Sequence, residues 1–118
     1  MGFLRRSPSK PVSPANDTVP VADQLRRAGA DPSVPHVTRH FLYIPGVKAA
    51  QQVARKVRSP GRNVDVETSA RTGYWLVIVA QSMVVTPENL AAVRREFEAV
   101  ARDVGGEYDR WQVDIAGG

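Results

Sequence analysis

The apolar run Tyr-Trp-Leu-Val-Ile-Val-Ala at residues 74–80 decides the fold class of this chain. It is rich in β-branched and aromatic side chains, and Gly73 stands directly before it. A continuous apolar run of this length is typical of a central strand of a sheet. We therefore predict a central β-strand at this position.

The residues before this run alternate strictly between apolar and polar over 63–68. Val64 and Val66 face one way, while Asp65 and Glu67 face the other, which predicts a half-buried strand. The loop between the two strands, 69–73, has hairpin length, so we expect the strands to pair antiparallel.

A helix is predicted after the central strand. Thr86 is a good N-cap residue, Pro87 fits the first helical position, and Gly105 is a natural stop. Between them, apolar residues recur at steps of three and four and form one stripe: Leu90, Val93, Phe97, Val100 and Val104.

Three further elements complete the pattern. Residues 36–44 are predicted to form a strand, 47–58 an amphipathic helix that ends at Ser-Pro-Gly, and 107–115 a last strand with Trp111 and Val113 on one face. The order strand, helix, strand, strand, helix, strand predicts an α+β fold of the ferredoxin-like βαββαβ kind. We expect a four-stranded antiparallel sheet with two helices on one face.

The chain divides into three predicted parts. Residues 1–18 are rich in proline and basic residues and are expected to form a flexible tail. Residues 19–32 are expected to form a short leading helix, anchored by Leu25, and a turn. Residues 33–118 form the predicted globular domain.

Composition narrows the function classes. The net charge is +4 with a pI near 10.0, and there is no cysteine, which excludes disulfides and thiolate chemistry. The segment 33–118 holds eleven basic and nine acidic residues, a near balance that argues against a dedicated phosphate-binding surface. No apolar run is long enough to span a bilayer, and no signal peptide is visible, so we expect a soluble cytoplasmic protein without membrane contact.

No catalytic, metal or cofactor site emerges from the residues. His36 and His40 share a strand face but are expected to lie roughly 13 Å apart, too far for one metal ion. The carboxylates of Asp65 and Glu67, like those of Glu107 and Asp109, belong to strands with an apolar opposite face and are interpreted as solvated. We therefore expect a protein that is not an enzyme.

Direct RNA binding is an alternative, because RNA-recognition modules share this topology and stack bases on aromatic side chains of the sheet. Tyr43, with Tyr74 or Trp75, could play this part. The acidic residues Asp65, Glu67 and Asp114 are expected on the open face and would repel phosphates.

The C-terminal cluster 106–111, Gly-Glu-Tyr-Asp-Arg-Trp, is the strongest local pattern. Together with Gly-Ala-Asp-Pro at 29–32 and the His-Phe pair in the strand around 37–43, it resembles the regulator of ribonuclease activity B family, inhibitors of ribonuclease E. The resemblance covers about residues 21–115 and implies a ferredoxin-like fold.

The resemblance further implies a non-catalytic regulator that binds a ribonuclease E-type endoribonuclease and affects RNA decay. We predict the partner contact at four residues, with Trp111 as the support of the others: Glu107, Tyr108, Asp109 and Trp111. Nucleic acid is a secondary partner, and a homodimer or a small-ligand-binding domain are further alternatives.

Overall fold

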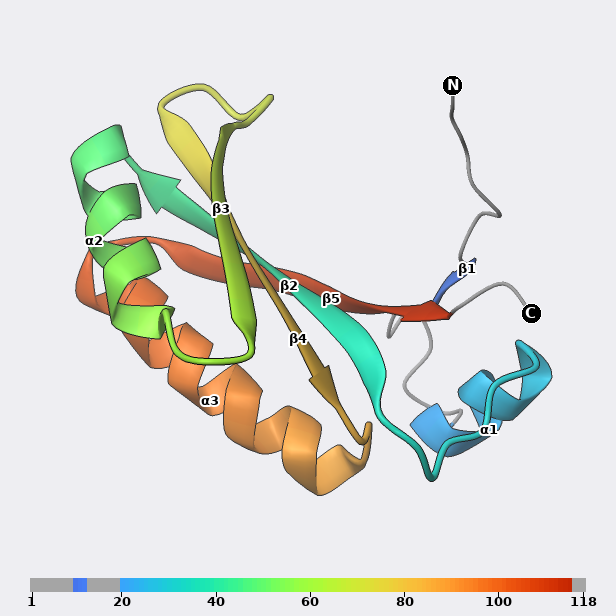
Figure 1. Cartoon of the computed structure of the whole chain (residues 1–118). Helices are drawn as coiled ribbons and strands as arrows, with labels where there is room; N and C mark the ends of the chain where they lie inside the picture. Colours follow the sequence, from blue (N-terminus) through green and yellow to red (C-terminus); the bar gives the residue numbers. More distant parts are fainter. Residues whose placement is uncertain (1–9, 13–19, 116–118) are drawn as a thin grey trace, which may run out of the picture.

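The computed structural model describes residues 10–12 and 20–115, which form five strands and three helices (Figure 1). In chain order these are β1 (Lys10–Val12), α1 (Val21–Arg27), β2 (His36–Pro45), α2 (Val47–Val57), β3 (Arg62–Thr68), β4 (Tyr74–Met83), α3 (Pro87–Asp103) and β5 (Glu107–Ile115). From β2 to β5 this is the predicted order, with boundaries that differ by a few residues at most.

All neighbouring strands pair antiparallel, in the order β1-β5-β2-β4-β3. The predicted α+β class and the antiparallel sheet of four long strands are confirmed, and the apolar run of β4 lies between β2 and β3 as expected. The sheet also gains a short fifth strand, β1, beside β5. Lys10–Val12 belong to the segment expected to be a flexible tail, and the rest of 1–18 lies outside the described residues.

Helices α2 and α3 lie side by side against one face of the sheet, here called the inner face (Figure 1). The core between them is made of fully buried aliphatic and aromatic side chains, among them Leu42, Ile44, Val53, Val57, Val77, Val79 and Phe97. Burying a side chain of this kind stabilises the fold by about 1.5–3 kcal/mol, so this layer dominates stability.

A second apolar cluster holds the leading helix α1 against the far end of the same face. Leu25 is fully buried, and it packs with Val85, Leu90 and Trp111. The leading helix predicted within 19–32 is therefore tied to the domain through Leu25 and Trp111.

Both ends of α3 have the caps that the sequence predicts. The Thr86 side chain accepts a hydrogen bond from the Asn89 backbone N–H at 3.0 Å, which satisfies one free donor of the first turn. At the other end Gly105 has φ 77°, and the N–H of Gly106 donates to the Ala101 carbonyl at 2.8 Å. A Cβ on Gly106 would lie 2.5 Å from a carbonyl oxygen of β2, so only glycine lets β5 start this close to β2.

Candidate partner-binding site

The four contact residues predicted from the sequence all lie on β5: Glu107, Tyr108, Asp109 and Trp111. β5 and β2 pair in a register that shifts once, because Tyr108 opposes Leu42 whereas Arg110 opposes Phe41. Asp109 is the extra residue between them and forms a β-bulge. The strand therefore changes its alternation inside the predicted motif.

The bulge divides the predicted residues between the two faces of the sheet. Tyr108 and Trp111 both point to the inner face, although residues three apart in a regular strand point to opposite faces. Glu107 and Asp109 are exposed on the uncovered face, here called the open face. The structure thus brings the two carboxylates together and separates them from the two aromatic rings.

Glu107 belongs to a cluster of charges and aromatic rings on the open face. Its carboxylate accepts from the Arg71 guanidinium at 2.6 Å. The same guanidinium lies 4.0 Å from the ring centre of Tyr74 and 5.4 Å from that of Tyr43. The hydrogen bond from Arg71 to Glu107 is the largest cause that raises the pKa of this arginine.

A second group of the same kind surrounds Asp109. Its carboxylate is 3.4 Å from the Arg110 guanidinium, which lies 4.1 Å from the ring centre of Phe41. Farther along the open face Arg39 pairs with Asp114 at 2.5 Å. The arginines of this face are therefore neutralised by neighbouring acids. We call the residues of the first two groups the sheet-face cluster: Phe41, Tyr43, Arg71, Tyr74, Glu107, Asp109 and Arg110.

On the inner face, Tyr108 takes part in a chain of buried hydrogen bonds. The Tyr108 hydroxyl lies 3.0 Å from Nδ1 of His40, and Nε2 of His40 lies 3.2 Å from Oγ1 of Thr38. Oγ1 of Thr38 in turn donates to the Gln81 carbonyl. The Thr38 hydroxyl gives its only proton to the Gln81 carbonyl, so it accepts a hydrogen bond from Nε2–H of His40. Nδ1 of His40 then accepts from the Tyr108 hydroxyl. This series of hydrogen bonds fixes His40 in its neutral form, with the proton on Nε2.

Burial dominates the titration of this pair. It lowers the pKa of His40 to about 4, with a further lowering from the positive charge of Arg62. Burial also raises the pKa of the Tyr108 hydroxyl well above its usual range. Both ring nitrogens of His40 are used by protein groups, and the Phe97 ring packs edge-on against it at 5.0 Å. This histidine therefore acts as a satisfied core residue.

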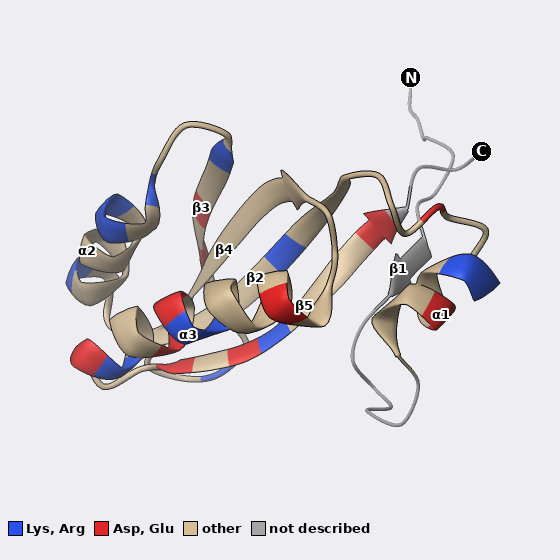
Figure 2. Cartoon of the chain, turned by 90° about the horizontal axis from the view of Figure 1, so that it is seen from below, with Lys and Arg blue, Asp and Glu red and all other residues tan. Residues whose placement is uncertain are grey.

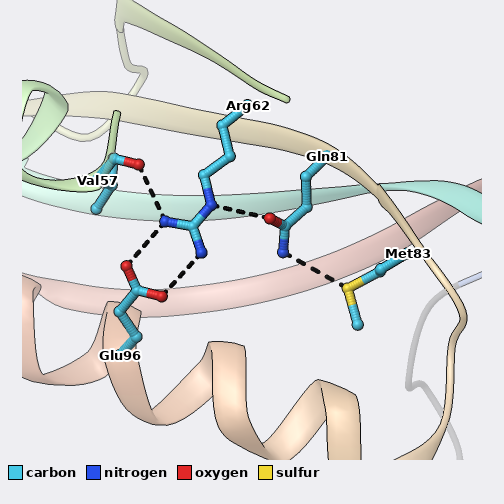
Figure 3. Close-up of polar contacts among 5 residues, drawn as sticks. All are labelled: Val57, Arg62, Gln81, Met83 and Glu96. Atoms are coloured by element: carbon cyan, nitrogen blue, oxygen red, sulfur yellow. Dashed lines mark hydrogen bonds and ion pairs between the residues drawn. The ribbon is translucent and has the colours of Figure 1, made fainter. Parts of the chain in front are cut away.

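A third polar cluster joins four elements around Arg62, at the start of β3 (Figure 3). Its guanidinium donates twice to the Glu96 carboxylate of α3 at 2.8 Å, once to the Gln81 side chain of β4 at 2.8 Å, and once to the Val57 carbonyl of α2 at 3.0 Å. The hydrogen bond from Arg62 lowers the pKa of Glu96. The cluster holds both helices to the sheet.

The residues examined for metal binding are also engaged in local structure. His36 Nε2 lies 2.7 Å from the Asp31 carbonyl oxygen, and the Asp31 carboxylate accepts from the backbone N–H and hydroxyl of Ser33. These bonds from Ser33 lower the pKa of Asp31. Within the described residues, no group of three or more histidine, aspartate or glutamate side chains could hold a metal ion.

The residues considered for RNA stacking have mixed positions. Tyr43 and Tyr74 lie on the open face, where Arg71 covers both rings. Trp75 packs against the inner core instead. Asp65 and Glu67 are exposed along β3, as the alternation predicts.

The sequence did not identify three residues of the sheet-face cluster as site residues: Arg71, Arg110 and Phe41. Arg71 and Glu107 are 36 positions apart in the chain, and their contact depends on the sheet register. The one local signal was the mixture of acids and arginine around Trp111, which indicated a surface but not its partners.

The fold and the open face together define a small α+β domain whose sheet carries aromatic rings and paired charges on the face opposite its helices. The family model described as RraB, regulator of ribonuclease activity B, matches residues 15–113. The match covers more than half of the chain, so the chain belongs to this family, and the resemblance found in its sequence is confirmed. The family implies regulation of ribonuclease activity.

Neither the curated proteins nor the solved structures gave a match. Among the helices of the described residues, none is both long and apolar enough to cross a membrane.

Proposed function

We propose that this protein is a non-catalytic, cytoplasmic regulator that binds a ribonuclease E-type endoribonuclease and alters its cleavage of RNA. The observation that carries the proposal is the family match together with the open face of the sheet. The three helices of the described residues pack against the inner face, so none of them covers the sheet-face cluster.

The composition of the sheet-face cluster supports a protein contact. Tyrosine and arginine are enriched at the energetically important centres of protein interfaces. Here Arg71 lies over two tyrosine rings and Arg110 over Phe41, so the rings and guanidinium groups are already ordered. Glu107 and Asp109 stand beside them, each paired with one of these arginines, so the cluster offers a partner a surface of balanced, ordered charges. Of the four residues predicted from sequence, we keep these two carboxylates as contacts, and assign Tyr108 and Trp111 to their support.

The burial and the hydrogen bonds of His40 support the proposal that the protein is not catalytic. A general base needs access to a substrate proton and a pKa near the working pH. His40 is fully buried, and both its ring nitrogens are held by Tyr108 and Thr38.

The topology also supports assigning the four long strands to the ferredoxin-like class. β2 and β3 flank β4, and β4 and β5 flank β2, so each βαβ unit is split by a strand of the other. This assignment belongs to the proposal.

The test is a reconstituted assay with a purified ribonuclease E-type enzyme and a fluorescent RNA substrate. We expect the protein to bind the enzyme and change the cleavage rate. The double variant Glu107→Lys/Asp109→Lys should bind about tenfold more weakly or worse, because it reverses two contact charges. The matched control Glu88→Lys/Asp103→Lys reverses two exposed acids of α3 and should bind within about twofold of the original.

Two results would count against the proposal. One is a wild-type protein that neither binds the enzyme nor changes its rate. The other is a cleavage of RNA by the protein alone that disappears with a His40 variant of unchanged stability.

Direct binding of single-stranded RNA is a second candidate, favoured by the position of Tyr43 and Tyr74 on the open face with Arg71 between them. Stacked aromatic and arginine side chains bind bases without sequence preference. A filter-binding titration of an RNA oligonucleotide against wild type and Tyr43→Ala/Tyr74→Ala tests it. Equal RNA binding by both proteins would exclude the sheet face as the RNA site.

A further inference from the structure

A groove of about 430 Å³ runs between α2 and α3, on the side of the molecule away from the open face. Val53 of α2 is fully buried at its base, and the half-buried Val100 and Val104 form the wall contributed by α3. The wall contributed by α2 is polar and basic, with Gln52, Arg55 and Lys56. The groove is thus apolar inside and cationic along one rim.

The basic rim continues along α2. Lys48, Gln52 and Lys56 are spaced four residues apart, and Arg55 follows Gln52 by three, which places these residues on one side of the helix. The helix carries no acidic residue, and Figure 2 shows α2 banded in blue alone, whereas α3 has both colours. Exposed Arg58 extends this charge past the end of the helix.

These cations are unpaired, in contrast to those of the open face. Arg39, Arg71 and Arg110 each have an acidic partner within the sheet. No ion pair within the described residues involves the four basic side chains of α2 and its C-terminal end: Lys48, Arg55, Lys56 and Arg58. Their charge is available to a partner.

Helix electrostatics explain only part of this pattern. Arg55 and Lys56 suit the negative C-terminal end of the helix dipole, but Lys48 lies in the first turn, where a cation is unfavourable. Lys48 thus extends the positive charge of the groove rim at a position that the helix dipole does not favour.

We propose that this groove, named here the α2–α3 groove, binds an acidic amphipathic helical segment of a partner protein. An apolar stripe at spacing i, i+3, i+4 and i+7 would cover the exposed parts of Val100 and Val104, and flanking carboxylates would meet Arg55, Lys56 and Lys48. α2 has 11 residues and is about 16 Å long, so it matches a segment of three turns. The proposal does not depend on the enzyme that the open face contacts.

Other occupants fit less well. The N-terminal segment of this chain carries Arg5, Arg6 and Lys10 and would meet like charges. A second copy placing its own α2 here would do the same. A nucleic acid would find aliphatic valines in place of the aromatic rings on which bases stack.

The test uses synthetic peptides of about 14 residues, long enough for the three turns plus ends. The first has leucines at the stripe positions and glutamates elsewhere. The second replaces glutamate by lysine, and the third scrambles the first so that no stripe remains. A labelled single-stranded RNA is the fourth probe. Binding is followed by fluorescence anisotropy and located by NMR shift changes of the full-length protein.

We expect the acidic amphipathic peptide to bind at least about tenfold more tightly than the scrambled and basic ones, with shift changes centred on Arg55, Val100 and Val104. Arg55→Glu/Lys56→Glu should lose this binding and accept the lysine peptide instead. The charge-matched control Arg27→Glu/Arg95→Glu changes exposed arginines away from the groove and should bind like the original.

Three outcomes would overturn the proposal. The acidic peptide binds no better than its scrambled form, its shift changes lie outside the α2–α3 groove, or only RNA binds and Arg55→Glu/Lys56→Glu abolishes that binding. Because no ribonuclease is present, failure here leaves the proposed regulation untouched, and failure of the regulation assay leaves this test valid.

Discussion

At the scale of single residues, the inner face of the sheet contains a histidine that the fold keeps neutral. His40 has no exposed surface, and its ring is fixed between Tyr108 and Thr38. Its position as a strand residue was predictable from the β-branched and aromatic residues of 36–44. Its burial was not, because it depends on two residues far away in the chain, Phe97 of α3 and Tyr108 of β5, that pack against the ring.

The stability of the protein should fall with pH between 6.5 and 4. The pKa of His40 is about 4 in the folded chain and 6.5 in the unfolded chain, so in this window the unfolded state binds more protons. The contribution of His40 to the free energy of unfolding is complete above pH 6.5 and is lost as the pH falls toward 4. The total change is up to about 3 kcal/mol. Urea unfolding at several pH values measures it. His40→Gln should flatten this part of the profile, and an unchanged slope would contradict the assignment.

Replacing Arg62 by lysine should destabilise the protein. An ammonium group cannot reproduce the paired donors that meet Glu96, Gln81 and Val57 together. We expect Arg62→Lys to lower the free energy of unfolding by about 1–3 kcal/mol. Glu96→Gln should cost less, because that carboxylate is 41% exposed. Urea unfolding of both variants measures these losses. An Arg62→Lys protein with an unchanged free energy of unfolding would show that the cluster is not stabilising.

At the scale of helices and strands, local patterns predicted nearly everything between β2 and β5. The alternation in β3, the apolar run in β4 and the cap at Thr86 are signals carried by neighbouring residues, so a single sequence reveals them. The bulge at Asp109 and the pairing of β1 with β5 depend on contacts between distant segments and left no comparable signal.

Deleting Asp109 should leave a protein that still folds cooperatively. Without the extra residue, Tyr108 and Trp111 are two positions apart, and regular alternation keeps both aromatic rings on the inner face, opposite Leu42 and His40. The cost should therefore stay below that of truncating a buried aromatic side chain, about 3–5 kcal/mol. Asp109→Asn keeps the bulge and should change stability by about 0.5 kcal/mol or less. Thermal unfolding followed by circular dichroism compares the variants; a deletion variant without a cooperative transition would contradict the assignment of Asp109 as the extra residue.

The start of β5 offers a second test of close packing. Gly106→Ala should be destabilising by about 2 kcal/mol or more, because the new Cβ would meet a backbone oxygen and Ile44 of β2. Gly73→Ala, where the Cβ has free space and only the positive φ of 83° is strained, should cost about 1 kcal/mol. The order of the two melting temperatures is the measurement, and the reverse order would disprove the close approach.

At the scale of the whole molecule, the leading helix packs against the domain through the second apolar cluster. A domain boundary at residue 33 was predicted from composition, yet Val21 and Leu25 of α1 pack with Trp111, Val85 and Leu90. Composition alone could not reveal this contact, because the partners of Leu25 lie at the other end of the chain.

A fragment of residues 33–118 should therefore be less stable than the full chain. It would expose Trp111, Val85 and Leu90, and losing the buried Leu25 side chain alone is worth about 2–5 kcal/mol. Tryptophan fluorescence should shift to longer wavelength, and urea unfolding should begin earlier. A fragment as stable as the full protein, with an unchanged spectrum, would show that α1 is dispensable.

The place of β3 at the outer side of the sheet has one more consequence. β3 pairs only with β4, so among the described strands it leaves one row of backbone donors and acceptors open to a foreign strand. Asp65 and Glu67 project from this strand, and another copy docking there would bring carboxylates against carboxylates. Such charges oppose the edge-to-edge growth that leads to fibres. The acidic residues that do not suit phosphate binding thus protect the protein from self-association into aggregates.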